Sequence, residues 1–362
     1  MANQIDMEKL KALGVPEEVI AAMDPADGGN IDANGNVLFL DEERQKSKER
    51  PDVPLRVNKT DPNIEAMALE MSKTNSRPDY DAEPFFSGLI AGAGAPVGSE
   101  GYFNSLGLMG FLAGSYTGGT VMPLNVDLSE ATQSKVLPID LAIDFLQYAD
   151  YIAIVDTCVC RRSYQCKDYP IDIGCLFFNS AGRRVVELGI AKEATPDEAK
   201  AHILKAKDAG LFCNAEFVEG EQFVWGLKNA EMNEFKMFCF CCTCCCLAMR
   251  MIRNAQEKEV KKRYQSCGYT AVADHSKCIG CHKCQEASKC PVNAISYRED
   301  GKCRIDQDMC LGCGFCTYVC EAGALSVKQT FPMRDNVNDY FLKEIRIDDE
   351  ISKKNIAERK HG

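Results

Sequence analysis

Cysteine places the strongest constraint on what this chain can fold into. The 362 residues contain 21 cysteines, the first of which is Cys158, and eighteen of them form two blocks. Secreted proteins tie so many cysteines into disulfides, but this N-terminus lacks the basic and apolar regions of a secretory signal, and the count is odd. The pattern therefore predicts metal ligation by thiolates in a reducing cytoplasm.

The charge of the chain is unevenly distributed and argues against one class of partner. The net charge is −11, and residues 1–84 carry ten Lys or Arg against eighteen Asp or Glu. Nucleic-acid binding needs a basic footprint, so we expect no nucleic-acid partner. The one basic run, residues 258–263, is expected to be a solvated helix end or a docking patch for an acidic partner.

The second cysteine block contains one motif twice. The first copy is Cys278, Cys281, Cys284 and then Cys290, and the second is Cys310, Cys313, Cys316 and then Cys320. Three thiolates two residues apart can wrap a loop around three corners of an iron–sulfur cubane, and the fourth corner must be reached from farther away. The alternative is a zinc ion in a tetrahedral site, because paired Cys-x2-Cys motifs also bind zinc.

Over about 60 residues, this block resembles the bacterial-type two-cluster ferredoxins. The resemblance implies two [4Fe–4S] clusters, with the fourth cysteine of each run bound to the other run's cluster. One set is then Cys278, Cys281, Cys284 and Cys320, and the other is Cys310, Cys313, Cys316 and Cys290. The chain departs from the pattern in the five residues between Cys284 and Cys290 and in Glu321, which stands where proline is usual. His275 and His282 are expected to be surface or hydrogen-bonding residues.

The first cysteine block is less regular. Its members are Cys158, Cys160, Cys166 and Cys175, followed by Cys239, Cys241, Cys242, Cys244, Cys245 and Cys246. Because the side chains of adjacent residues diverge, we expect the run 239–246 to lie between two clusters and to supply ligands to each. Ten cysteines suffice for two [4Fe–4S] clusters with two to spare, and spacing does not identify the spare ones. A loop with one cluster and a larger, non-cubane cluster are the alternatives.

Residues 120–250 are similar to a functionally uncharacterised family of iron–sulfur proteins from strict anaerobes. The similarity lies in the Cys-Val-Cys-Arg sequence at 158–161, the stretch from Cys166 to Phe177, and the run 239–246. It implies iron–sulfur electron transfer and little about a substrate. Arg161, Arg162 and Lys167 lie beside these thiolates, where a cation would raise a cluster's potential, although each could equally face solvent.

We expect an α+β fold with four regions. These are an acidic, largely extended N-terminal arm (1–84), a cysteine-rich α/β iron–sulfur domain with a glycine-rich entry segment (85–265), a ferredoxin domain with two clusters (266–330), and a polar tail (331–362). The expected elements are a hairpin around 37–40, helices over 4–23, 139–149, 195–209 and 247–264, and strands over 151–155 and 221–227. Residues 85–124 are expected to be buried, irregular backbone without membrane contact, because glycines break every apolar run.

The leading functional hypothesis is an electron-transfer protein or subunit that relays single electrons through several [4Fe–4S] clusters to or from a partner oxidoreductase. No nucleotide-binding motif is present. One alternative is a reductase with its catalytic site at an upstream cluster, for which Asp156, Asp168, Asp172 and His202 are the acid–base candidates. Another is a carrier of clusters. Cys213, Cys267 and Cys303 fall outside both patterns and are expected to be free thiols.

Overall fold

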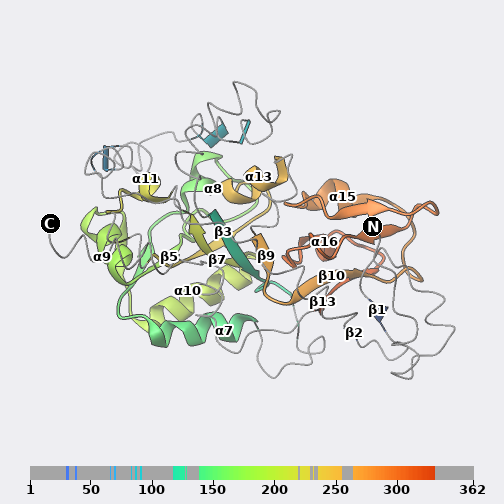
Figure 1. The fold of residues 1–362 in the computed structure, drawn as a ribbon, viewed down its shortest axis with the longest axis horizontal. Helices are drawn as coiled ribbons and strands as arrows, with labels where there is room; N and C mark the ends of the chain where they lie inside the picture. Colours follow the sequence, from blue (N-terminus) through green and yellow to red (C-terminus); the bar gives the residue numbers. More distant parts are fainter. Residues whose placement is uncertain are drawn as a thin grey trace, which may run out of the picture.

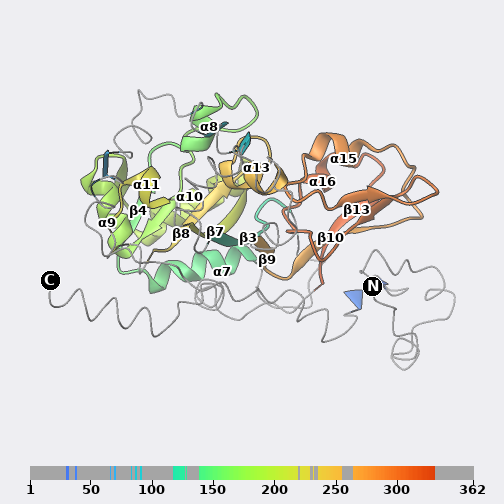
Figure 2. The ribbon, with the colours of Figure 1, turned by 45° about the horizontal axis from the view of Figure 1, so that its top comes forward.

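The structure is a computed structural model. It describes residues 117–126, 128, 138–218, 221–228, 231, 235–254 and 264–330, together with a few residues before 117. Within these ranges the chain forms a seven-stranded sheet covered by helices, followed by a smaller segment of paired strands that carries the second cysteine block (Figures 1 and 2).

The seven-stranded sheet is antiparallel except at one edge, where β3 and β9 are parallel. In spatial order its strands are β6 (Ala191–Glu193), β4 (Ile152–Val155), β5 (Leu176–Phe178), β8 (Met237–Cys241), β7 (Phe212–Val218), β3 (Thr117–Met122) and β9 (Tyr264–Ser266). The helices of this part are α7 (Pro138–Phe145) with a short 3-10 turn η1 (Leu146–Tyr148), α8 (Val159–Ser163), α9 (Asn179–Glu187), α10 (Pro196–Asp208), α11 (Glu221–Trp225) and α13 (Leu247–Asn254).

Both faces of the sheet are covered, which explains why β4 is a continuous apolar run. All four of its residues are buried. Ile152 and Ile154 pack into one core with α7 and α10, whereas Ala153 and Val155 pack into a second core with α9 and α11. Figure 1 shows α7 and α10 along one side of the sheet and α8 and α13 on the other. The strand expected over 151–155 and the helix that begins at Pro138 are therefore confirmed.

Helix α10 begins and ends as its sequence predicts. The Thr195 hydroxyl accepts a hydrogen bond from the Glu198 backbone N–H, and the Glu198 carboxylate accepts one from the Thr195 N–H, which completes a capping box. Pro196 occupies the first turn, and Gly210 after the helix adopts a left-handed φ of +76°.

The glycine-rich entry segment is more regular than we expected. Residues 117–122 form strand β3 inside the sheet, and the described residues Phe86, Ser87, Ile90 and Ala91 are helical. Gly119 faces Asn214 of β7, where a Cβ atom would lie 2.3 Å from the Asn214 side-chain oxygen. Glycine thus allows close approach of two neighbouring strands in this segment, rather than irregular backbone.

One other expectation for the first domain was wrong, and a second was confirmed only in part. Residues 221–225 form helix α11 and not a strand, and the Trp225 indole donates a hydrogen bond to Glu221 one turn earlier. The helix expected over 247–264 is described only to Asn254, and Tyr264 begins strand β9. The apolar spacing over 221–227 was compatible with either structure, and packing against the core decides it.

In the N-terminal arm the structure describes few residues. Strands β1 (Asn30–Ile31) and β2 (Val37–Leu38) pair antiparallel, as the expected hairpin requires. Ala66, Leu69, Glu70 and Glu83 are helical, in a region expected to be largely extended. The helix expected over 4–23 and the tail after residue 330 lie outside the described residues.

The segment from 269 to 330 repeats one strand–helix–strand unit, as its sequence predicts. Strands β10 (Tyr269–Ala273) and β13 (Leu325–Gln329) pair antiparallel, and so do β11 (Ile295–Tyr297) and β12 (Cys303–Ile305). Helices α15 (Lys283–Ser288) and α16 (Phe315–Tyr318) each begin directly after a Cys-x2-Cys pair. The part of the chain that the structure describes contains no helix of the length and apolarity needed to cross a membrane.

Removing the α10 cap should weaken the first domain without touching any cysteine. We predict that Thr195→Ala lowers the free energy of unfolding by about 1 kcal/mol, because the backbone N–H of Glu198 loses its acceptor and the Glu198 carboxylate loses the hydroxyl that helps to hold it. Urea denaturation followed by circular dichroism measures this. Thr195→Ser keeps the hydroxyl and is the control, and an equal loss in both variants would contradict the capping role.

Candidate metal centres

The two loops of the second cysteine block are built on matching glycines. Gly280 and Gly312 each lie two residues after the first cysteine of a run, with φ of +67° and +66°. A Cβ atom at Gly312 would lie 1.9 Å from the Tyr269 carbonyl oxygen, so the turn requires glycine there. The repeat in sequence is therefore a repeat in backbone conformation.

Backbone N–H groups donate hydrogen bonds to thiols at matching positions in the two halves of this segment. Four thiols each accept one such bond at an N–Sγ distance of 3.3 Å: Cys278 from Cys303, Cys290 from Ala294, Cys310 from Ala271 and Cys320 from Ala324. Donors directed at sulfur stabilise the anionic thiolate over the thiol and tune any metal cluster that it holds.

These thiols line two separate cavities. One is lined by Cys278, Cys281, Cys284 and Cys320, and the other by Cys290, Cys310, Cys313 and Cys316. The structure thus brings together the same two sets of four that the crossed ferredoxin arrangement predicts. Cys290 and Cys320 each leave their own run to reach the other cavity.

Four cysteines of the first block form a compact set, which we call the four-thiol group. Its members are Cys166, Cys242, Cys244 and Cys245, whose sulfur atoms all lie within 4.8 Å of one another. Cys166 follows helix α8, and the other three lie in the turn after strand β8. Hydrogen bonds from Cys242 and Cys245 lower the pKa of the Cys244 thiol, which favours the thiolate form at this position.

The other six cysteines of the block form a second set, the six-thiol group. Its closest pairs are Cys175 with Cys239, at 3.1 Å between sulfurs, and Cys241 with Cys246, at 3.4 Å. Further thiol hydrogen bonds join Cys160 to Cys246 and to Cys158, and Cys239 to Cys241. Cys158 lies just before helix α8, and Cys160 lies in its first turn.

All ten cysteines of the block are therefore divided between two groups. The run 239–246 contributes to both: Cys239, Cys241 and Cys246 belong to the six-thiol group, and the other three belong to the four-thiol group. The expectation from the sequence that adjacent cysteines of the run 239–246 would face two different sites therefore agrees with this division. The two thiols beyond the needs of two cubanes both lie in the six-thiol group.

Arg161 lies between the two groups and is almost fully buried, with 1% of its surface exposed. Its guanidinium donates to the carbonyl oxygens of Pro170 (2.7 Å), Phe240 (2.7 Å) and Ile173. Burial lowers the pKa of Arg161, but the charges of nearby thiolates, first Cys158 and then Cys242, outweigh it and raise the pKa. One buried cation thus ties the loops of both groups together.

A second arginine joins the four-thiol group to the ferredoxin segment. Arg253 on α13 donates from Nη1 to the carbonyl oxygens of Thr243, at 2.9 Å, and Lys289, at 2.8 Å. Thr243 lies between two members of the four-thiol group, and Lys289 precedes Cys290. Figure 2 shows α13 at the junction between the sheet and this segment. The sequence offers no pattern from which this contact could have been predicted.

The acid–base candidates do not converge on a site. Asp156 and Asp168 are exposed. Asp172 accepts a hydrogen bond from the Lys205 ammonium at 2.5 Å, and this contact lowers the pKa of the carboxyl. His202 is buried, its Nε2 lies 2.8 Å from the Gly174 carbonyl oxygen, and burial lowers its pKa. The role of His202 is to hold the backbone beside Cys175.

The remaining cationic candidates differ in burial. Lys167 is exposed, whereas Arg162 is half-buried and donates to the Thr157 hydroxyl at 3.2 Å.

The sequence did not single out the buried carboxylate of Glu216. It accepts a hydrogen bond from the Tyr264 hydroxyl. Burial raises the pKa of Glu216 to about 7.

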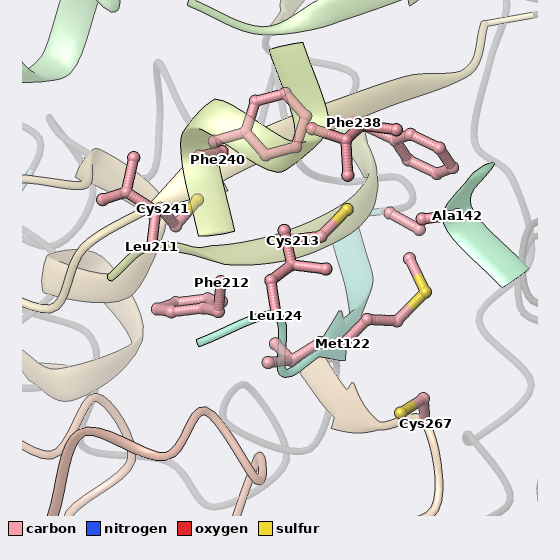
Figure 3. Packing of buried hydrophobic residues seen from close by; sticks show 14 of the residues in the cluster. Met122, Leu124, Ala142, Leu211, Phe212, Cys213, Phe238, Phe240, Cys241 and Cys267 are labelled. Carbon is pink, nitrogen blue, oxygen red and sulfur yellow. The ribbon is translucent and has the colours of Figure 1, made fainter. Parts of the chain in front are cut away.

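The three cysteines outside both patterns have different surroundings. Cys213 and Cys267 are buried among apolar side chains of the first domain, as Figure 3 shows around Met122, Leu124 and Phe238. Cys303 instead lines the first ferredoxin cavity, 3.6 Å from Cys284 between sulfurs. We expected Cys303 to be a free thiol because its spacing fits no motif, but it lies where strand β12 passes the cavity.

Comparisons with known proteins place residues 277–324 in one family. These residues match the model of the 4Fe-4S dicluster domain. Hydrogenase-4 component A of Escherichia coli is 38% identical over 69 residues, which are 18% of this chain and 33% of that protein. The formate dehydrogenase iron-sulfur subunit of Wolinella succinogenes is 40% identical over 47 residues, which are 13% of this chain and 24% of that protein.

A third relative is the pyruvate synthase subunit PorD of Methanocaldococcus jannaschii, 34% identical over 58 residues, which are 16% of this chain and 65% of the relative. The chain thus spans about a third or less of the first two relatives and under two thirds of the third. No solved structure gave a significant match. The similarity to the anaerobe family over residues 120–250 stays a prediction.

Replacing Arg161 should destabilise the first domain even when its charge is kept. We predict that Arg161→Lys lowers the free energy of unfolding by about 3 kcal/mol or more, because one ammonium cannot reach all three carbonyl oxygens and leaves buried acceptors unpaired. Urea denaturation under anaerobic conditions measures this. Lys167→Gln, at an exposed position, is the control, and equal stability of the two variants would contradict the role of Arg161.

Proposed function

We propose that this chain is an iron–sulfur electron-transfer protein or subunit that relays single electrons to or from a partner oxidoreductase. In this proposal the ferredoxin segment holds two [4Fe–4S] clusters, and the four-thiol and six-thiol groups hold one each. The observation that carries the proposal is the pair of cavities, each lined by one of the two predicted sets of four cysteines, within residues that match the 4Fe-4S dicluster domain.

The residues fit such clusters in number and chemistry. A cubane needs four thiolates, one at each iron, and each cavity offers at least four thiols. Each cavity also has two thiols that accept backbone N–H bonds at 3.3 Å, which compensate negative charge on sulfur. When bound, a [4Fe–4S] cluster accepts and releases one electron. The protein holds the thiolates and excludes water around them.

Side-chain contacts support a linear order of the four sites. Arg161 lies between the six-thiol and four-thiol groups, and Arg253 bridges the four-thiol turn to the residue before Cys290. Cys290 in turn lines the second ferredoxin cavity, and its own run of cysteines lines the first. The order is therefore six-thiol group, four-thiol group, second cavity and first cavity.

The outer end of this order is suited to contact with a partner. Cys281 in the first cavity is exposed, and Ile279 beside it is 75% exposed. The three relatives are named as a component or a subunit of an enzyme, which supports a partner oxidoreductase here as well. We place this activity in the cytoplasm of an anaerobe.

The surplus of thiols in the six-thiol group supports a second candidate function. Six thiolates are two more than a cubane uses, so this group could hold a larger cluster or one with an exchangeable ligand. A reductase whose catalytic cluster lies there would show an electron paramagnetic resonance (EPR) signal that shifts when a small substrate binds. A cluster carrier would lose that cluster to an apo-protein.

Iron analysis of anaerobically purified protein tests the number of clusters. We predict about sixteen irons per chain, four for each cubane. Cys244→Ala should remove about four of them, because it takes one of four ligands from the four-thiol group. Cys213→Ala, in the apolar core, is the control and should keep all of them. About eight irons in the native protein would contradict the two upstream clusters.

Anaerobic affinity purification from the native cell tests the partner. We expect the tagged chain to bring down a larger oxidoreductase, identified by mass spectrometry and by its own metal content. Exposed Ile279 should contribute, so Ile279→Glu should reduce recovery without changing the iron content. A monodisperse monomer with full iron content would argue against a stable partner.

A further inference from the structure

The two halves of the ferredoxin segment are matched residue by residue, and at one position they differ in chemistry. The backbone N–H of Cys303 donates to Cys278, and the N–H of Ala271 donates to Cys310, both at 3.3 Å. Cys278 and Cys310 are the first cysteines of their runs. Cys303 and Ala271 are therefore equivalent positions, with a thiol in one half and a methyl group in the other.

The extra thiol lies inside the first cavity. Cys303 is 3% exposed, lines the cavity together with the four predicted ligands, and lies 3.6 Å from Cys284 between sulfurs. In the other half the counterpart of Cys284 is Cys316, and the described lining of that cavity contains four thiols together with Ala271. The first cavity thus has five thiols where its twin has four.

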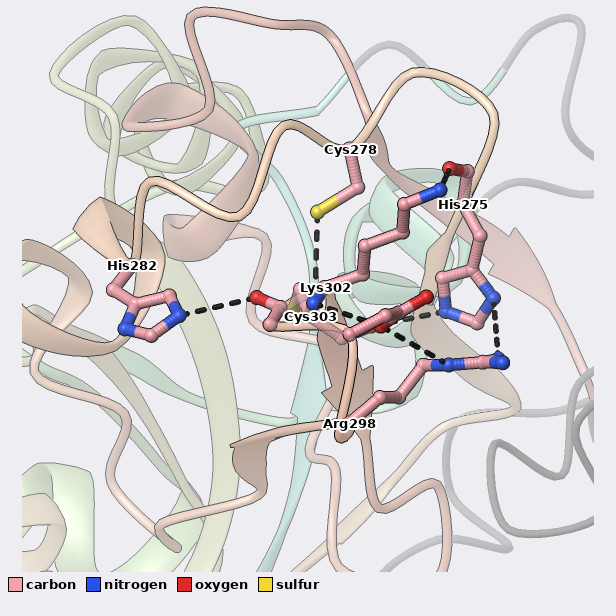
Figure 4. Close-up of polar contacts among 8 residues, drawn as sticks. His275, Cys278, His282, Arg298, Lys302 and Cys303 are labelled. Atoms are coloured by element: carbon pink, nitrogen blue, oxygen red, sulfur yellow. Dashed lines mark hydrogen bonds and ion pairs between the residues drawn. The ribbon is translucent and has the colours of Figure 1, made fainter.

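A network of side chains fixes the backbone of Cys303, as Figure 4 shows. Arg298 Nη1 donates to His275 Nδ1 at 2.9 Å, since a guanidinium has no acceptor. The proton on the imidazole is then on Nε2, which donates to the Cys303 carbonyl oxygen at 3.0 Å. Lys302 donates to the His275 carbonyl oxygen at 2.9 Å. The thiol is therefore held at the cavity wall by its own strand.

We propose that Cys303 is a reserve ligand for the iron that Cys284 holds. The inference rests on the proposed function, in which this cavity contains a [4Fe–4S] cluster. Two sulfur atoms 3.6 Å apart on one wall can reach the same iron, and a cysteine needs only rotation about one torsion to do so. In the exchange the iron–sulfur bond to Cys284 breaks and the bond to Cys303 forms. The proton of the Cys303 thiol passes to the Cys284 sulfur, and no electron is gained or lost.

The internal repeat supplies matched variants for the test. Iron content and EPR spectra are measured on the full chain, purified anaerobically. Cys284→Ala should keep nearly all its iron, with an altered EPR signal from the cluster that changes ligand. Cys284→Ala combined with Cys303→Ala should lose about four irons, and so should Cys316→Ala, because the described lining of its cavity contains no further thiol. Adding Ala271→Cys to Cys316→Ala should restore the lost iron.

If Cys284→Ala loses as much iron as Cys316→Ala, the proposal is overturned. A native protein without iron in this segment would instead overturn the proposed function, so the two failures are distinct. A second measurement avoids loss of any predicted ligand. Cys303→Ala alone should keep its iron but release it from the first cavity severalfold faster to a chelator, and Ala271→Cys should slow release from the second. Unchanged release rates in both would also refute the reserve role.

Discussion

Adjacent side chains on one backbone segment point in different directions, and the upstream half of this molecule depends on that constraint. Within the run 239–246, Cys241 and Cys246 meet in the six-thiol group, while Cys242, Cys244 and Cys245 meet in the four-thiol group. One turn of the chain therefore lies between the two groups of thiols and contributes cysteines to each. The buried cation Arg161 compensates the negative charge that accumulates on each side of that turn. Without it, the loops that carry the ten upstream cysteines would lack a common anchor.

The sequence predicted local features well wherever the signal was itself local. The capping box at Thr195 and the buried strand β4 were both predicted, because a few neighbouring residues decide them. Strand β3 and helix α11 were missed, because their conformation depends on the neighbouring strands and the core against which they pack. The two ferredoxin sets were expected from the resemblance to two-cluster ferredoxins, whereas the membership of the two upstream groups was not predicted. Cys175 and Cys239 meet across 64 residues, and no pattern in the sequence records that contact.

The ferredoxin repeat is symmetric in backbone and asymmetric in chemistry. Both halves use the same glycine turn and the same N–H to sulfur bonds, so the two cavities share one construction. They differ in what surrounds the thiols. The first cavity has Cys303 and Tyr297 beside Cys284, and Cys281 is exposed, whereas the second is lined by apolar residues such as Ile295 and Ile305. Cluster potentials follow hydrogen bonding and solvent exposure, so two clusters in these cavities would differ in potential.

The arrangement of four metal centres is tested most directly by locating the iron itself. A crystal structure of the anaerobically purified chain, with anomalous scattering recorded at the iron edge, would show where the irons lie. We predict four separate centres: one in each ferredoxin cavity, one among Cys166, Cys242, Cys244 and Cys245, and one in the six-thiol group. Iron in the two ferredoxin cavities alone, with the upstream thiols metal-free, would contradict the four-centre arrangement.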